Sequence, residues 1–127
     1  MARREPEAVP SGLPSNYLKA CSLLLISEAP AHGYQLLARL SAVAPIGFDL
    51  GALYRVLRGM EDDGLVVSTW EESALGPDRR VYAITRRGRQ ALDAEAEVLG
   101  EVLVDMGTFI RRFTRISRRV VVVAVAS

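Results

Sequence analysis

The stretch of sequence that decides the fold is residues 49–70, DLGALYRVLRGMEDDGLVVSTW, in which a helical pattern changes into a strand pattern. Its first part carries apolar residues at helical spacing: Leu50, Leu53, Leu57 and Met60. Asp49 is a good helix N-cap, and Gly64 is the residue type that ends helices in the left-handed conformation. Leu65–Trp70 is rich in valine, threonine and tryptophan, as strands are. The stretch therefore predicts a helix over 49–63 followed by a strand over 65–70.

The opposite face of this helix is small and basic. It carries Gly51, Arg55, Arg58 and Asp62, with Ala52 and Gly59 alongside. Arginines among small residues would let the helix enter the major groove of DNA and donate to guanine edges or phosphates. We therefore predict DNA contacts from Gly51, Ala52, Arg55 and Arg58. An ordinary solvated face would carry the same kinds of residue, and this helix alone does not separate the two interpretations.

Two further helices are predicted on the N-terminal side. Leu18, Cys21 and Leu25 recur at helical spacing and indicate a buried helix over 15–27. Pro30 suits the opening turn of a second helix, which should end near Ser41. The stretch 42–48 contains a proline and a glycine and is typical of a turn. Residues 1–14 carry three prolines and mixed charges, which favours a flexible arm.

A hairpin and a long helix are predicted on the C-terminal side. Residues 81–85 form a second strand pattern, and a loop with a Gly-Pro pair separates it from 65–70. Arg79 and Arg80 flank the tip, where a wing would lie against the phosphate backbone, although exposed tips are commonly charged for solubility. Thr85 can cap a helix over 86–116. The fold class is mainly α with a small β hairpin: a winged helix-turn-helix domain over 15–85 and a long C-terminal dimerisation helix.

The long helix carries an apolar seam. Its members alternate in spacings of four and three: Leu92, Ala96, Leu99, Leu103, Met106, Ile110 and Phe113. This is the pattern of two packed helices, and it predicts a homodimer interface. The helix could instead fold back on its own domain, especially near Leu92. Residues 117–127 form a valine-rich tail, for which packing on a partner and disorder both stay open.

Composition argues against several other classes of protein. The formal net charge is only +1, so nucleic-acid binding has to depend on where the charges lie. Cys21, the single cysteine, can form neither an internal disulfide nor a cysteine metal cluster. The apolar runs are too short to span a membrane and no signal peptide pattern is present, which favours the cytoplasm. The single histidine, His32, lacks a catalytic constellation, so we expect no enzyme, cofactor or metal, and a capping or packing role at the second helix.

Three motifs in order resemble the PadR family of transcriptional regulators. They are Ala31-His32-Gly33-Tyr34, the run Leu53–Leu65, and Gly76-Pro77 followed by Arg80–Thr85 and Gly88. The resemblance covers roughly residues 23–99. It implies a repressor-like homodimer whose third helix and wing bind a palindromic DNA operator, in some cases released by a small-molecule effector. Many members have proline after the tyrosine of the third helix, where this chain has Arg55, so the operator sequence is in doubt.

Three aromatic residues have open roles. Tyr34 and Tyr54 could each donate a hydrogen bond to a phosphate, and the resemblance favours Tyr54, but a structural role is equally compatible with their type. For Trp70 we expect core packing, and lining a cavity near the dimer seam is the alternative. A winged helix that binds another protein, without selective affinity for DNA, is the alternative function.

Overall fold

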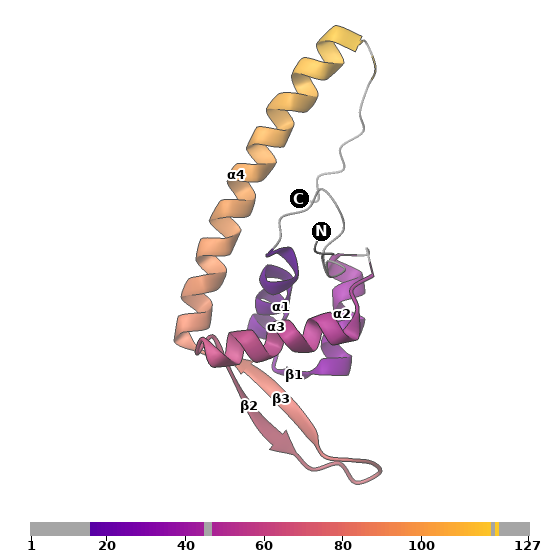
Figure 1. Cartoon of the computed structure of the whole chain (residues 1–127), viewed down its shortest axis with the longest axis vertical. Helices are drawn as coiled ribbons and strands as arrows, with labels where there is room; N and C mark the ends of the chain where they lie inside the picture. Colours follow the sequence, from indigo (N-terminus) through magenta and orange to yellow (C-terminus); the bar gives the residue numbers. More distant parts are fainter. Residues whose placement is uncertain (1–15, 45–46, 118, 120–127) are drawn as a thin grey trace, which may run out of the picture. The chain divides into compact units, whose positions relative to one another are not determined.

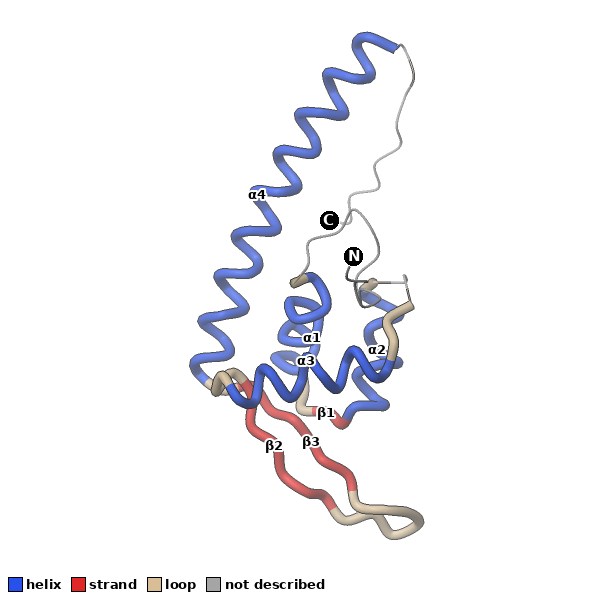
Figure 2. Tube along the Cα trace, viewed as in Figure 1, coloured by secondary structure: helices blue, strands red, loops and turns tan. Residues whose placement is uncertain are grey.

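The computed structural model describes residues 16–44, 47–117 and 119 (Figure 1). Its elements, in chain order, are α1 (Tyr17–Glu28), β1 (Ala31–His32), α2 (Gly33–Val43), α3 (Leu50–Asp62), β2 (Val66–Glu71), β3 (Arg79–Ile84) and α4 (Arg86–Ser117). Figure 2 shows the same order as helices and strands. The expected fold class is confirmed. The predicted arm, 1–14, and all of the tail except Ser117 and Arg119 lie outside the described residues.

The sheet has one strand more than the sequence predicted. It is antiparallel with the order β1-β3-β2, and Ala31 pairs with Tyr82 while Val66 pairs with Ile84. The prediction of a helix beginning at Pro30 was wrong. Ala31 and His32 pair with β3 as a short strand, and the helix begins at Gly33. A strand of two residues has no periodicity of its own, so only its partner reveals it.

The core of the first unit lies between α1, α2, α3 and the inner face of the sheet. Its fully buried side chains include Leu18, Leu23, Ile26, Leu36, Leu40, Leu53, Leu57, Met60 and Val66. Cys21 is also buried, as predicted, and burial raises the pKa of its thiol above the ordinary value. The apolar faces read from the sequence are therefore the faces that pack together.

Both ends of α3 are formed as the sequence predicts. The carboxylate of Asp49 accepts a hydrogen bond from the backbone N–H of Ala52 at 3.0 Å, which satisfies one of the free donors of the first turn. Gly64 has a φ of 76° and ends the helix in the left-handed region. The cap and the glycine fix where the helix gives way to β2.

The junction of β3 and α4 is tied to the end of α3. The hydroxyl of Thr85 accepts the N–H of Gly88 at 3.0 Å and donates toward the carbonyl oxygen of Gly64 at 2.7 Å. A β-carbon on Gly88 would collide with the carbonyl oxygen of Leu65. This junction therefore requires both the capping hydroxyl and a residue without a side chain.

The chain divides into two compact units, Met1–Asp93 and Ala94–Ser127, and the boundary falls within α4. In the first unit, Leu92 packs against the winged-domain core, so we assign it to that core rather than to the predicted dimer seam. In the second unit, several large apolar side chains of α4 are exposed: Val98, Leu103, Val104, Met106, Phe109 and Ile116. The rings of Phe109 and Phe113 stack with their centroids 6.5 Å apart.

Candidate nucleic-acid interface

The exposed face of α3 carries most of the residues predicted for DNA contact. Gly51, Arg55 and Arg58 are exposed, while the opposite face is anchored by Leu53, Leu57 and Met60 in the core. The prediction for Ala52 was wrong, because its side chain is only 2% exposed. Ala52, Val56 and Met60 follow one another at intervals of four and lie on the same side of α3. They make the buried face wider than the one that Leu53 and Leu57 define. Two arginines thus lie on the outer side of a rigidly held helix.

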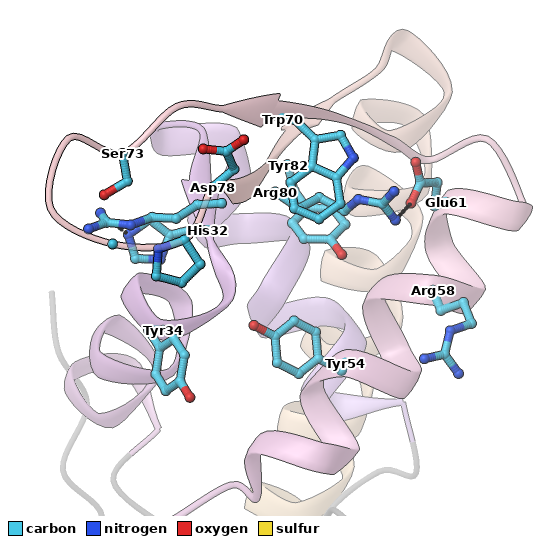
Figure 3. A pocket seen from close by; sticks show the side chains of 13 residues that line it. His32, Tyr34, Tyr54, Arg58, Glu61, Trp70, Ser73, Asp78, Arg80 and Tyr82 are labelled. Carbon is cyan, nitrogen blue, oxygen red and sulfur yellow. Dashed lines mark hydrogen bonds and ion pairs between the residues drawn. The ribbon is translucent and has the colours of Figure 1, made fainter.

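Two tyrosines flank this face from different elements. Tyr34, in the first turn of α2, is 67% exposed. Tyr54 of α3 is half-buried, and its ring lies so close to Gly33 that any side chain at that position would collide with it. Figure 3 shows both phenol rings on the same side of the unit as Arg58. The structure therefore brings Tyr34 and Tyr54 to one surface with an α3 arginine.

The wing carries a stacked pair that the sequence did not predict. Strand register places Trp70 of β2 opposite Arg80 of β3, and the guanidinium lies over the indole, 5.0 Å from the ring centroid. Trp70 is 66% exposed, so the expectation of core packing was wrong. The hairpin extends beyond the helices that form the core (Figure 1). At the position of Trp70 there are therefore no core side chains against which the indole could pack. The indole instead supports a cation, an arrangement that tryptophan favours.

Glu61 of α3 connects this helix to both strands of the wing. One of its carboxylate oxygens accepts the hydroxyl of Ser68 at 2.6 Å, and the other lies 4.0 Å from Arg80. A hydrogen bond to a carboxylate is among the stronger kinds, whereas a half-exposed ion pair at this separation contributes little stability. Glu61 therefore ties α3 to β2 through Ser68 and lowers the net positive charge beside Arg80.

Arg79 and Arg80 point to different partners, because successive side chains of a strand alternate between its faces. Nη1 of Arg79 lies 3.3 Å from Nε2 of His32, whereas Arg80 lies with Trp70 and Glu61. His32 caps α2, and the expectation of a capping role for this residue is confirmed. The sequence analysis assigned the same role to both arginines. It could not distinguish them, because the neighbour of Arg79 is His32 of β1, a strand that the sequence did not predict.

An open cleft of about 710 Å³ lies between the wing, α3 and the start of α2 (Figure 3). Its walls include the aromatic residues Tyr34, Tyr54, Trp70 and Tyr82 together with Arg58 and Arg80. Burial raises the pKa of the Tyr82 hydroxyl above its ordinary value, and the charge of Arg80 partly opposes this. The cleft thus combines aromatic faces with guanidinium groups, the chemistry that nucleic acids contact.

Two other features are absent from the part of the chain that the structure describes. Within residues 16–44, 47–117 and 119, no group of three or more histidine, cysteine or acidic side chains could hold a metal ion. Over the same ranges, no helix combines the length and the apolar character needed to cross a bilayer.

Comparison with protein families and solved structures gives consistent matches. The profile of the "Transcriptional regulator PadR-like family" matches residues 23–94. A PadR-like transcriptional regulator from Bacillus cereus is 29% identical, with a TM-score of 0.64, and the match covers 72% of this chain and 89% of that one. A potential transcription factor, described as of unknown function, is also 29% identical, with a TM-score of 0.71 and coverage of 87% and 99%.

A transcriptional regulator from Clostridium thermocellum has the same fold at 19% identity, with a TM-score of 0.72 and coverage of 80% and 98%. No curated protein matches the chain.

Proposed function

The chain belongs to the PadR-like family of transcriptional regulators, and from this premise we propose that it is a homodimeric repressor that binds a palindromic DNA operator in a sequence-specific manner. Family membership also supports the interpretation that the chain is not an enzyme. We also propose that the protein is cytoplasmic, because a transcriptional regulator has to reach DNA.

One observation carries the proposal: Arg55 and Arg58 lie exposed on a helix whose other face is held in the core. A recognition helix has to present donors to the major groove without giving up its packing. In this proposal the two arginines contact base edges, Gly51 allows a close approach, and Tyr34 and Tyr54 donate to phosphates. The wing then lies along the backbone, where its contacts add affinity but little selectivity.

The exposed apolar side chains of α4 support the dimer. Leu103 is 57% exposed and Phe109 is 69% exposed in the single chain. Contiguous apolar surface of this kind is uncommon on monomers and marks interaction sites. We propose that the seam consists of Ala96, Leu99, Leu103, Met106, Ile110 and Phe113, without Leu92. A two-fold pair would present two copies of α3 to two half-sites. Release of the operator by a small-molecule effector, which the family resemblance implies in some cases, belongs to the same proposal.

A binding titration tests the proposal. Fluorescence anisotropy would compare a duplex from the DNA upstream of the protein's own gene with a shuffled duplex of equal composition, across a range of salt concentrations. We expect tighter binding to the upstream duplex and an affinity for both that falls steeply with salt, because phosphate contacts release counterions.

Equal and weak affinity for both duplexes would contradict operator recognition and favour the alternative, a winged helix that binds another protein. The small net charge of +1 is compatible with that alternative.

A further inference from the structure

The cap of α2 favours one of the two proton positions on His32. Nδ1 of the imidazole accepts the backbone N–H of Gln35 at 3.4 Å, while the side chain of Gln35 accepts the backbone N–H of His32 at 3.1 Å. This reciprocal pair is a capping box. A nitrogen that accepts a hydrogen bond carries no proton, and a neutral imidazole has its single proton on the other nitrogen. The cap therefore favours the tautomer with a hydrogen on Nε2.

Nε2 of His32 then faces a second donor. Nη1 of Arg79 lies 3.3 Å away, and a guanidinium has five N–H donors and no acceptor. In the tautomer that the cap favours, both nitrogens are donors and cannot bond to each other, whereas in the other tautomer Nε2 would accept from Arg79. Among the described residues, no carboxylate lies within ion-pair distance of Arg79, whereas Arg80 has Glu61 beside it. The two nitrogens thus lie side by side with the same unmet requirement, which is an acceptor oxygen.

We propose that His32 and Arg79 form a two-donor site for a phosphate group, and that its ligand is the phosphodiester backbone of DNA. The inference rests on the proposed function, because the phosphate group belongs to the DNA that the protein is proposed to bind. The oxygens of a phosphodiester can accept from Nε2 and from the guanidinium together, and a charge-assisted bond of this kind is stronger than a neutral one. Free inorganic phosphate has the same oxygen chemistry, so the test includes both.

The site supplies something that a lone wing arginine cannot. His32 is held by the α2 cap and Arg79 comes from β3, so a shared phosphate would join the start of α2 to the wing. Contacts to phosphates fix the register of a protein on the duplex. The site would therefore set where Arg55 and Arg58 of α3 meet the bases, although it contacts no base itself.

The single histidine makes the site directly observable. Long-range proton–nitrogen NMR of the ¹⁵N-labelled protein, recorded at roughly pH 8 where an ordinary imidazole is neutral, reports which nitrogen carries the proton. We expect the Nε2–H form in the free protein. On saturation with a duplex of about 24 base pairs, long enough for two half-sites, we expect the Nε2 signal to move more than the Nδ1 signal. The Nδ1–H form, or an Nε2 signal that stays unchanged in the complex, would overturn the site.

Two variants separate the donors. His32→Asn retains an acceptor for the α2 cap and loses the Nε2 donor, so the melting temperature should stay close to wild type while affinity for every duplex falls roughly ten-fold. Its salt slope should be unchanged, because a neutral imidazole releases no counterion. Arg79→Gln should weaken binding similarly and reduce the salt slope by about 0.9, the value for one phosphate. If both variants bind DNA as tightly as the wild type does, the site is overturned.

Inorganic phosphate provides the arm that distinguishes the source of the ligand. An Nε2 signal that moves with the duplex, and far less with millimolar phosphate, supports the DNA backbone. A signal that responds to inorganic phosphate in a protein that binds no duplex would overturn the DNA assignment and the proposed function together. Tight, selective DNA binding with an unmoved Nε2 signal would overturn the site alone and leave the proposed function standing.

Discussion

The ring of Tyr54 in α3 lies directly against Gly33, the first residue of α2: a β-carbon on Gly33 would stand 2.6 Å from Cζ of Tyr54. Glycine is therefore required here by the close approach of a side chain from another helix and not by an unusual backbone angle. The contact links the start of α2 to the middle of α3. It also places the Tyr54 hydroxyl at the edge of the cleft that faces the wing.

Gly33→Ala should displace the Tyr54 ring. We expect a loss of about 1–2 kcal/mol in the free energy of unfolding, because the added methyl overpacks the contact, and a fall in DNA affinity as the ring moves. Denaturant unfolding and anisotropy would measure both. The Gly33→Ala/Tyr54→Ala double variant should be more stable than the sum of the two single changes predicts, since the clash is then absent. Strict additivity would show that the ring does not meet residue 33.

Replacing both Arg55 and Arg58 with alanine should reduce the preference for the upstream duplex over the shuffled one. Each good base contact is worth about 1–3 kcal/mol, so the preference should fall at least ten-fold. Both side chains are exposed, and the melting temperature should not change. Arg115→Ala, which removes an exposed arginine from α4, is the control. Unaltered selectivity in the double variant would mean that α3 does not contact the bases.

Glu61→Gln should strengthen binding to any duplex. The change removes a negative charge beside Arg80 and keeps an oxygen that can accept the Ser68 hydroxyl. We expect affinity at low salt to rise roughly three- to ten-fold, with selectivity unchanged, because the effect is electrostatic. Arg80→Ala should do the opposite and lower the salt slope by about 0.9. If Glu61→Gln binds as the wild type does at low salt, Arg80 lies too far from phosphate to matter.

Gly88→Ala should destabilise the winged domain. Its β-carbon would meet the carbonyl oxygen of Leu65, a backbone atom that cannot move aside cheaply, and we expect a loss of about 1–3 kcal/mol. Gly100→Ala in α4 is the matched control, because nothing lies within 4 Å of its added carbon. That change should stabilise the helix by about 0.5–1 kcal/mol. Thermal melts would separate the two, and equal effects of the same sign would contradict the structure.

Replacing Leu103 and Ile110 with glutamate should give monomers. Charges at these positions would be buried without partners in a helix seam, which is strongly unfavourable. Sedimentation velocity at micromolar concentration would show the change, and operator affinity should fall sharply because a monomer meets one half-site. Thr108→Glu/Arg112→Glu puts acidic groups on another side of α4 and should leave the dimer intact. A wild-type monomer that still binds operator tightly would contradict the dimer.

The helix-turn-helix could be predicted because its signals are local. The Asp49 cap and the positive φ of Gly64 involve neighbouring residues only, and the apolar spacing in α3 states which face packs. The same holds for Thr85, which caps the helix that it precedes. Cys21 was placed correctly for a similar reason, since it lies within a continuous apolar run.

The sequence by itself determined the order of the helices and the hairpin and the leucine stripe on the buried face of α3, because each depends on contacts within a few residues. For His32 it left capping and packing both open. Only the tertiary structure decided that Ala31 and His32 add a strand to β3, that Ala52 is buried, and that Trp70 supports Arg80 at the surface. It alone also separated Arg79, beside His32, from Arg80, beside Glu61. These features depend on the pairing of segments up to 51 residues apart, from Ala31 to Tyr82, which no local pattern of spacing or composition encodes.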